Sequence, residues 1–372
     1  LADELRDLGV SDVTVTDKCY VIARIPGNVS RQVETIAFLA HVDTAPDTSG
    51  ENVRPQTWAD YDGSALQIGN GIVIDPEEYP DLLKYKGDTV ITADGSTLLG
   101  ADDKAGVAEI MTAVSYLVDH PEIAHGGLEI VFTPDEEIGH GVDGLDLSTL
   151  KSTTGFTLDG GEEGSIEAEC FSAYHVHVTF NGYVIHPGSA KNKMANAVAM
   201  AGRFLSMLPQ RESPEATSDR DGFYCPVEVH GDYGTAIVDL IVRDFEIAEV
   251  QRRLSYLEQL ARTIELHFPR SSVTVESTKQ YLNMRDTLND RPYILNMVKK
   301  AVEASGAEPR FHAIRGGTDG ARLTELGLPT PNIFAGGFNF HGKHEWVPVR
   351  GMVRAAQTVV FLANFWAELP QE

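Results

Sequence analysis

The pattern of apolar residues along the 372-residue chain changes near residue 171. Before that point, strand-like runs stand at 35–40, 128–133 and 155–158. The first is a continuous apolar run, which is typical of a parallel strand covered on both faces, and the second is mainly apolar. Between them, residues 107–117 repeat apolar positions at helical spacing. This part of the chain therefore predicts an α/β fold built on a parallel sheet.

A different pattern begins at residue 171, where alternating apolar positions predict a half-buried strand over 174–180. A helix, two strands, a second helix and a last strand are expected to follow, at about 194–208, 225–230, 235–245, 247–267 and 272–277. This βαββαβ order is the ferredoxin-like arrangement, a compact unit of its own.

Alternating helix and strand patterns return toward the end of the chain, with a strand at 332–334 and a helix at about 350–369. We therefore expect an αβα domain formed by residues 1–170 and 287–372. The ferredoxin-like unit, residues 171–286, is expected to be inserted into it.

The formal charge of −25 and the sequence pI near 4.8 narrow the classes of partner. Nucleic acids call for basic faces, and anionic membrane surfaces also repel so acidic a chain. No run of 18 apolar residues occurs, so no transmembrane helix is expected. We expect neither nucleic acid nor a membrane as a partner.

Three cysteines, Cys19, Cys170 and Cys225, are widely spaced and odd in number. This usage is typical of a reducing compartment, so we expect a cytoplasmic protein. The chain opens with Leu1 and the tail of an amphipathic helix, without an initiator Met. We expect that an N-terminal segment has been removed.

Two adjacent carboxylates, Asp102 and Asp103, stand immediately before the helix that begins near residue 104. Two unpaired carboxylates in a low-dielectric cleft are costly, so a compensating cation is one interpretation. The other is an ordinary helix start with Asp103 as the N-cap. This pair alone does not separate the two.

Further His, Asp and Glu residues follow the predicted strands. They are His41 and Asp43, Glu136 and Glu137, and Asp159. Asp43 can hold the second ring nitrogen of His41. Of two adjacent glutamates, one can bind metal while the other serves as a general base. Taken singly, the first pair also fits a surface turn and the second an acidic helix start.

Clusters at three successive strand ends are a stronger signal than any one of them, because open α/β sheets bind ligands at the carboxyl ends of their strands. The candidate set contains five oxygen or imidazole ligands and one additional carboxylate: His41, Asp102, Glu136, Glu137, Asp159 and His341. A single catalytic zinc has three protein ligands, so this set is too large for one ion. It predicts two metal ions that share one carboxylate. The ligand types suit Zn²⁺, with Co²⁺ or Mn²⁺ as substitutes.

Several motifs make the sequence resemble a known family: HVDTAPD, LLGADDKAGVAEIMTA, FTPDEEIG, LDGG, HPGSAK, IRGGTDGARL, GLPTPN and HGKHEW. It resembles the dizinc metallopeptidases that include carboxypeptidase G, succinyl-diaminopimelate desuccinylase and aminoacylase, and within them the peptidase T branch of tripeptide aminopeptidases. The resemblance runs nearly end to end. It implies a zinc-exopeptidase-like catalytic domain whose inserted ferredoxin-like unit is a lid.

The resemblance also implies residue roles. Asp102 would bridge both metals, and the remaining ligands would be His41 and Asp159 at one site and Glu137 and His341 at the other. Glu136 would be the general base and Asp43 the partner of His41. The HxxxE pattern ending at Glu345 favours His341 over His344, and the Asp102–Asp103 peptide is expected to be cis.

Three residues outside these clusters match substrate-contacting positions of the family. His186 would donate to the oxyanion, and Arg243 and Arg315 would bind a substrate carboxylate. Without the resemblance, His186 reads as a turn residue and Arg243 as a solvated charge at a strand end.

The function implied is removal of the N-terminal residue from tripeptides by a metal-bridging hydroxide, with Glu136 as general base. A sibling activity (carboxypeptidase, dipeptidase or acyl amino-acid deacylase) is the nearest alternative. A non-catalytic binding protein and a closed structural metal site are the others. The partners expected are small peptides, and the lid could also form a homodimer.

Overall fold

The computed structural model describes residues 1–369, and the chain forms two compact units. Unit 1 contains Leu1–Ala168, Met284–His312 and the residues from Thr318 on. Unit 2 contains Glu169–Asn283 together with the short segment Ala313–Gly317. Each unit has its own sheet and its own hydrophobic core.

Unit 1 is built on an eight-stranded mixed sheet with the order β1-β2-β8-β3-β9-β16-β10-β15. Its strands are β1 (Asp12–Val15), β2 (Val21–Ile25), β3 (Ile36–His41), β8 (Leu128–Thr133), β9 (Thr154–Gly160), β10 (Ser165–Cys170), β15 (Arg310–Ile314) and β16 (Asn332–Phe334). The central strands β8, β3 and β9 are parallel to one another. All residues of β3 and β8 are buried, which explains their mainly apolar sequences, and the buried Glu129 of β8 is paired with Arg24.

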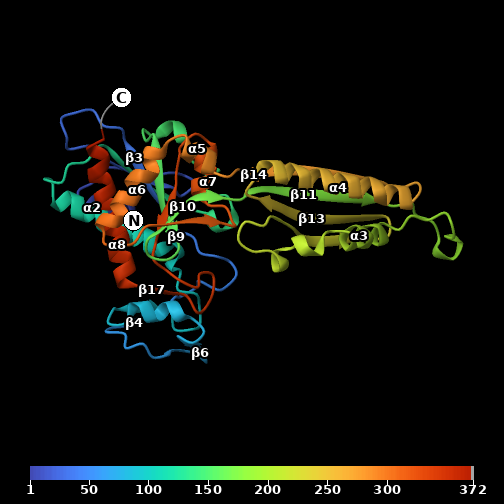
Figure 1. Ribbon diagram of the computed structural model, residues 1–372, viewed down its shortest axis with the longest axis horizontal. Coiled ribbons are helices and arrows are strands. Elements are labelled where there is room, and N and C mark those ends of the chain that lie inside the picture. Colours follow the sequence, from blue (N-terminus) through green and yellow to red (C-terminus); the bar gives the residue numbers. More distant parts are fainter. Residues whose placement is uncertain (370–372) are drawn as a thin grey trace. The chain divides into compact units, whose positions relative to one another are not determined.

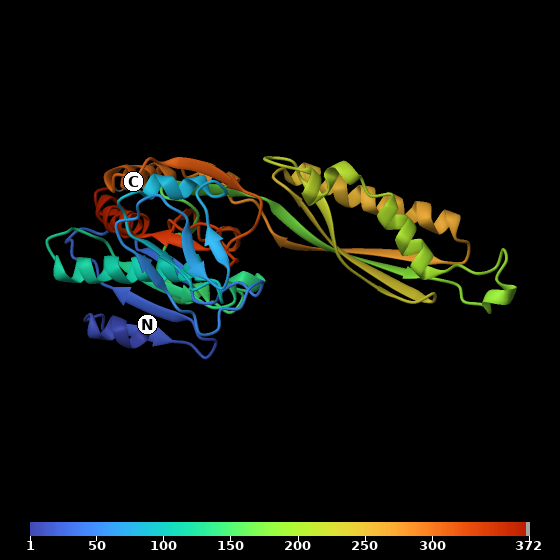
Figure 2. The same ribbon diagram turned by 90° about the horizontal axis from the view of Figure 1, so that it is seen from below.

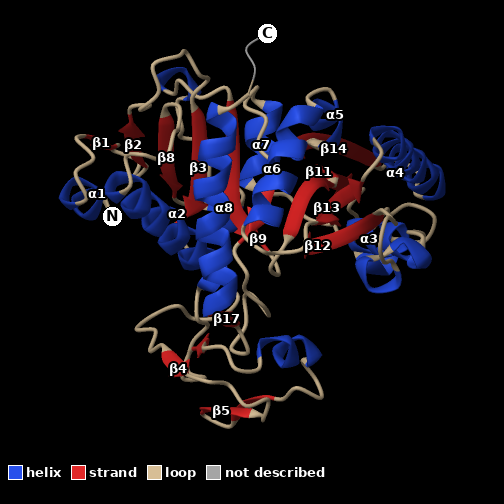
Figure 3. Cartoon of the chain, turned by 60° about the vertical axis from the view of Figure 1, so that its left-hand side comes forward, coloured by secondary structure: helices blue, strands red, loops and turns tan. Residues whose placement is uncertain are grey.

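Helices lie on both faces of this sheet, and Figure 3 shows the face with α8 in front of the strands. One face carries α2 (Ala101–Asp119), α6 (Pro292–Ala304) and α8 (Val349–Ala367), and α8 packs against the other two helices. The other face packs against α7 (Asp319–Glu325) and the segment 142–150. Two short helices, α1 (Ala2–Asp7) and α5 (Arg285–Asn289), lie elsewhere in the unit. The αβα layering predicted from the sequence is thus confirmed.

Residues 47–96 form a small addition to unit 1 rather than a bare loop. The tail strand β17 (Trp346–Pro348) pairs with β7 (Val90–Thr92), which pairs with β4 (Gln56–Trp58). A hairpin, β5 (Leu66–Gly69) and β6 (Ile72–Ile74), stands beside a 3₁₀ helix at Pro80–Tyr85. Trp346 is fully buried among the apolar side chains of this region. A residue far along the chain therefore anchors residues 47–96.

Unit 2 is a four-stranded antiparallel sheet with two helices on one face. Its elements are β11 (Ser172–Asn181), α3 (Ala197–Ser206), β12 (Phe223–Gly231), β13 (Thr235–Asp244), α4 (Ile247–His267) and β14 (Ser272–Tyr281). The order β12-β13-β11-β14 is ferredoxin-like, as predicted. Figures 1 and 2 show α3 and α4 running along the strands.

Alternation in the strands of unit 2 decides which side chains are buried. Val176, Val178 and Phe180 of β11 pack in the core with the helices, and the residues between them face the opposite side. Helix α3 begins where Asn196 caps the backbone N–H groups of Val198 and Ala199.

The sequence missed elements whose local pattern is weak. Strands β10, β15 and β17 and helix α7 are short and lack a long apolar repeat. The strand predicted at 155–158 extends to Gly160, so Asp159 lies within β9 rather than after it. Among the described helices, none combines the length and the apolar character that a membrane crossing requires.

Candidate metal centre

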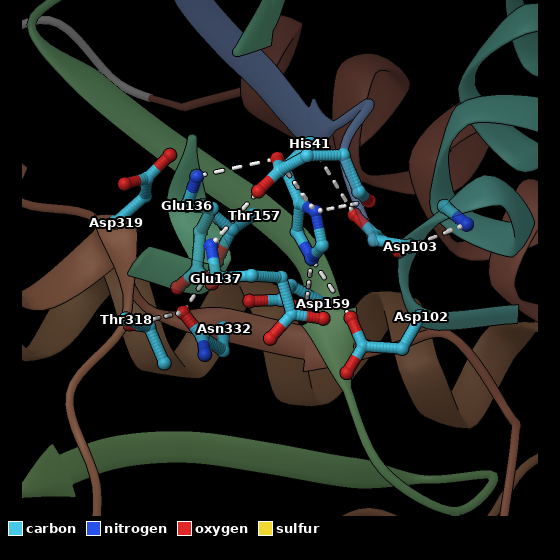
Figure 4. Close-up of polar contacts among 12 residues, drawn as sticks. His41, Asp102, Asp103, Glu136, Glu137, Thr157, Asp159, Thr318, Asp319 and Asn332 are labelled. Atoms are coloured by element: carbon cyan, nitrogen blue, oxygen red, sulfur yellow. Dashed lines mark hydrogen bonds and ion pairs between the residues drawn. The ribbon is translucent and has the colours of Figure 1, made fainter. Parts of the chain in front are cut away.

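The parallel strands of unit 1 bring the predicted residues to one edge of the sheet (Figure 4). Strand β3 ends at His41, and its neighbour β8 ends at Thr133, three residues before Glu136. Strand β9, on the other side of β3, carries Asp159 next to its last residue. Because the strands run in the same direction, their carboxyl ends meet, and the side chains gather there.

Asp102 lies between two histidines. Its Oδ1 is 2.8 Å from Nε2 of His41, and its Oδ2 is 3.2 Å from Nε2 of His341. His41 is 2 % exposed, whereas His341 is 45 % exposed. One carboxylate therefore presents each of its oxygens to a different imidazole.

The remaining predicted ligands contact the same two histidines. Nε2 of His41 is 3.5 Å from Oδ1 of Asp159, and Nε2 of His341 is 3.2 Å from Oε2 of Glu137. Two sets of three residues offer ligand atoms that lie within 4.8 Å of one another: His41, Asp102 and Glu137, and His41, Glu136 and Asp159. The two sets share His41, whose Nε2 can bind one cation only, so Asp102, which has an oxygen toward each histidine, is the residue suited to serve two cations.

Asp43 contacts the backbone of Glu136 and Glu137 as well as His41, whereas the sequence predicted only the contact with His41. Nδ1 of His41 is 3.1 Å from the carbonyl oxygen of Asp43 and 3.3 Å from its Oδ1. The Asp43 carboxylate also accepts hydrogen bonds from the backbone N–H groups of Glu136 and Glu137, at 3.2 and 3.1 Å. One side chain thus positions both the histidine and the glutamate pair.

Both interpretations of the Asp102–Asp103 pair are represented in the structure. Asp103 is fully buried, and its Oδ1 accepts the backbone N–H of Gly106, as an N-cap does. Its Oδ2 accepts the backbone N–H of His41, which ties the end of β3 to the start of α2. Asp102 alone faces the cluster. The peptide bond between the two aspartates is cis.

Glu345 holds the loop that carries Asp102. Its Oε2 accepts the N–H groups of Leu99 and Gly100 at 2.8 and 2.6 Å, and its Oε1 accepts that of Asp102 at 3.1 Å. Gly100 has a φ of 72°, the left-handed conformation that favours glycine at this turn. Glu345 is therefore a positioning residue.

The structure also separates the two histidines of the HGKHEW motif. His341 contacts Asp102 and Glu137, as described, and its backbone φ is 63°. The ring of His344 instead lies 5.6 Å from that of Tyr79. A non-glycine residue in the left-handed region is uncommon and often occurs at functional sites.

Burial and mutual repulsion shift the protonation of the cluster. Burial, with the charges of Asp159 and Asp319, raises the pKa of Glu136 to about 9. Burial also raises the pKa of Glu137 and of Asp159 to about 7 each. At Asp102 burial acts in the same direction, but the contacts with His341 and His41 outweigh it and hold the pKa of Asp102 below its usual range.

The pKa values of the two histidines are raised by their contacts with carboxylates, which favour the protonated rings. The hydrogen bond with Asp102 raises the pKa of His341 to about 9. Burial works to lower the pKa of His41, but its contacts with Asp102, Asp159 and Asp43 raise it far above the usual range. The cluster thus balances its negative charge with protons, and bound cations would do the same for deprotonated ligands.

A buried carboxylate oxygen of Glu137 is also suited to bind a cation. Oε1 of Glu137 is buried and has no hydrogen-bond partner among the described residues. A buried carboxylate oxygen without a donor is unfavourable unless a cation meets it. The donor set of imidazole nitrogens and carboxylate oxygens suits Zn²⁺, Co²⁺ or Mn²⁺.

The other three predicted site residues belong to unit 2. His186 is exposed and caps a 3₁₀ turn, where its Nδ1 accepts the N–H of Gly188. Arg315 lies 5.5 and 5.6 Å from the rings of Phe171 and Phe223 and donates to Oγ1 of Thr217.

Arg243 donates to the carbonyl oxygen of Arg315 from its Nη1, at 3.3 Å. Its Nε is buried without an acceptor in the described part of the chain. The Arg243 guanidinium therefore lies against the backbone of Arg315, and one of its donors is unused.

Asp319 is a member of the cluster that the sequence analysis did not assign. Its Oδ2 accepts a hydrogen bond from Oγ1 of Thr133 at 2.8 Å, and burial raises its pKa to about 6. Its charge contributes to the raised pKa of Glu136. The only sequence signal was its place in the RGGTDG motif, directly after Thr318, which caps α7.

The chain is similar to known peptidases along most of its length. Residues 81–364 match the model of Peptidase family M20/M25/M40. Peptidase T of Clostridium perfringens is 44 % identical over 368 residues, which cover 99 % of this chain and 91 % of that protein.

Two solved structures share the fold. An aminopeptidase PepT of Bacillus cereus superposes with a TM-score of 0.77 at 24 % identity, covering 98 % of this chain and 91 % of that one. A tripeptidase of Staphylococcus aureus gives a TM-score of 0.78 at 18 % identity, covering 99 % and 91 %.

The family match covers well over half of the chain, and the relative from Clostridium is similar along nearly its whole length. The resemblance seen in the sequence is therefore confirmed. This chain belongs to the Peptidase family M20/M25/M40 and is a hydrolase that acts on peptide bonds.

Proposed function

We propose that this chain is a dizinc aminopeptidase that removes the N-terminal residue from tripeptides. The observation that carries the proposal is the position of Asp102, whose two oxygens meet two different histidines. A carboxylate placed in this way would be suited to hold two cations, one at each oxygen. The names of similar proteins, Peptidase T, aminopeptidase and tripeptidase, support the substrate.

In this proposal His41 and Asp159 would complete one metal site, and Glu137 and His341 the other. Zn²⁺ is the expected ion, with Co²⁺ or Mn²⁺ as substitutes. When bound, two such cations lower the pKa of a water molecule and polarise the substrate carbonyl. Asp43 and Glu345 hold the ligands in place through His41 and the backbone of Asp102.

Glu136 would act as the general base. Its backbone N–H is held by Asp43, and its carboxylate lies within 4.8 Å of ligand atoms of His41 and Asp159. From there it accepts a proton from water as the water attacks the carbonyl. It then returns that proton to the amine that leaves.

His186 and the two arginines would contact the substrate. Nδ1 of His186 accepts a hydrogen bond, so the proton of the neutral ring resides on Nε2, and this N–H can donate to a developing oxyanion. Arg315 and Arg243 would bind the peptide carboxylate, and the unpartnered Nε of Arg243 is a donor suited to it.

The proposal keeps the domain boundaries expected from the sequence, with a catalytic domain at 1–170 and 287–372 and a lid at 171–286. It includes a cytoplasmic location, in keeping with the odd number of widely spaced cysteines. A homodimer through the lid is a further element of it.

The test is hydrolysis of an unblocked tripeptide, with zinc counted on the same sample. We expect release of the first residue, about two zinc ions per chain, and loss of activity on chelation. Two ions without tripeptide cleavage, but with cleavage of blocked acyl-amino acids, would move the substrate to a sibling activity. One ion or none, with no turnover, would contradict the bridging role of Asp102.

A further inference from the structure

The open face of the unit 2 sheet carries a second group of histidines and carboxylates. The core of this unit lies on the other face, where α3 and α4 cover Val176, Val178 and Phe180. The residues that alternate with them on β11 include His175 and His177, which are half-buried. Neither residue takes part in the proposed peptidase chemistry.

The register of the sheet brings three strands together at this point. His177 of β11 pairs with Asp239 of β13, which in turn pairs with Glu228 of β12. His230 follows two residues after Glu228 and therefore lies on the same face. On the other side, His177 pairs with Glu276 of β14.

Asp239 is the centre of the group. Its Oδ1 accepts from Nδ1 of His177 at 2.8 Å and is 3.2 Å from Nε2 of His175. Its side chain is 15 % exposed, so these contacts hold it in a defined place. Both histidines use the same oxygen, which leaves Oδ2 as a ligand atom.

A second side of the group is formed by β12. Nδ1 of His230 is 3.5 Å from Oε1 of Glu228. Glu228, His230 and Asp239 offer ligand atoms that all lie within 4.8 Å of one another. Zinc ligands converge on an ion about 2.0–2.2 Å away, so small side-chain rotations are enough to close such a set.

A hydrogen-bonded polar surface is the simpler interpretation, but it does not explain the composition. Cross-strand polar pairs stabilise a sheet modestly, and threonine or serine would form such pairs as well. Here three imidazoles and two carboxylates occupy adjacent positions on three strands. Imidazole and carboxylate are the ligands that divalent transition metals prefer.

We propose that Glu228, His230 and Asp239 bind one divalent transition-metal ion on the open face of this sheet. His177 positions Asp239 through its hydrogen bond, as residues behind a metal ligand do. The ion ties the edge strand β12 to β13, which gives it a structural role in unit 2. It would be a third ion of the chain, in addition to those proposed for unit 1.

Zinc binding to the full-length protein tests the proposal. The chain is loaded with Zn²⁺, freed of excess metal, and dialysed to equilibrium against a series of low Zn²⁺ concentrations. The variants are His230→Ala, Asp239→Asn and His177→Ala. The control is His267→Ala, an exposed histidine of α4 that is hydrogen-bonded to the carbonyl of Thr263.

We expect the wild-type protein and the control to bind one more zinc ion per chain than His230→Ala and Asp239→Asn. His177→Ala should bind it about 10–100-fold more weakly. Tripeptide hydrolysis should stay unchanged in His230→Ala, because that residue lies outside the cluster of unit 1. Failure of the peptidase proposal would leave this zinc count unaffected.

Thermal unfolding gives a second measurement. Added Zn²⁺ should raise the Tm of the wild type and of the control, but less that of His230→Ala. His230 is 53 % exposed, so its truncation leaves the core intact and the variant remains informative if Asp239→Asn does not fold. Equal zinc counts in the wild type, His230→Ala and the control would overturn the proposal.

Discussion

Two aspartates in this protein each lie between two histidines, and the comparison between them is instructive. Asp102 presents one oxygen to His41 and the other to His341. Asp239 presents a single oxygen to both His175 and His177. The side chains are almost equally exposed, at 13 % and 15 %, so burial of the carboxylate is not what distinguishes them.

The difference lies in how each group is assembled. The Asp102 cluster collects residues from β3, the start of α2, the segment after β8, β9 and a loop near the end of the chain. The Asp239 group comes from adjacent strands in register. Loop ends can converge on a point from several directions, whereas a sheet face offers ligands from one side only. The first arrangement therefore suits two enclosed ions and the second one open site.

The largest effect is expected from paired substitutions of the two aspartates. Asp102→Asn should lose both ions of unit 1 and reduce tripeptide hydrolysis to background, because the bridging charge is removed. Asp239→Asn should lose only the third ion and keep its hydrolysis. Metal counts and turnover on the two purified variants check this. Equal loss of activity in both would remove the distinction drawn here.

The next largest effect is expected from Glu136, which is proposed to transfer a proton and not to bind a metal ion. Glu136→Gln should retain its metal and lose about 10²–10⁴ in kcat, since the amide accepts no proton. Glu122→Gln, at an exposed glutamate of unit 1, is the matched control. Turnover near the wild-type rate in Glu136→Gln would contradict the assignment of Glu136 as the general base.

A smaller effect is expected from the residue that holds Asp102. Glu345→Gln turns one of the two acceptors for three backbone N–H groups into a donor. Metal retention should weaken about 10–100-fold, and excess Zn²⁺ should restore activity.

The neighbour His344→Ala is the control for Glu345→Gln, since its ring contacts Tyr79 instead of the cluster. If zinc fails to restore activity to Glu345→Gln, Glu345 has a role other than positioning. If His344→Ala loses as much metal, the assignment of His341 is wrong.

The smallest effect concerns a carboxylate with no proposed ligand role. Glu109 of α2 is 1 % exposed, and neither side-chain oxygen has a hydrogen-bond partner among residues 1–369. Burial raises its pKa well above the ordinary 4.5, so the folded state keeps a proton that the unfolded state releases. The contribution of Glu109 to stability is therefore greatest below pH 4.5 and is lost as the pH rises toward the folded-state pKa.

Glu109→Met removes this dependence while keeping the volume of the side chain. We expect its Tm to exceed that of the wild type by on the order of a few degrees at pH 8, with the gap closing toward pH 4. Melting curves across that range measure it. A gap that stays constant with pH would show that Glu109 is not the titrating group.

The sequence by itself determined the layers and the chemistry of the main cluster. A continuous apolar run identified β3, a mainly apolar run identified β8, and alternation identified β11, because burial on two faces or one leaves a distinct pattern. His, Asp and Glu residues placed after parallel strands predicted a shared edge, since such strands end on the same side.

Only the tertiary structure decided what depends on contacts between distant residues. It gave Asp102 one histidine for each oxygen, made Asp103 a buried link between β3 and α2, and brought Glu345 to the loop before α2. It also set the register that joins Asp239 with residues of two other strands. Local periodicity carries no information about such pairings, because they are fixed by packing between segments far apart in the chain.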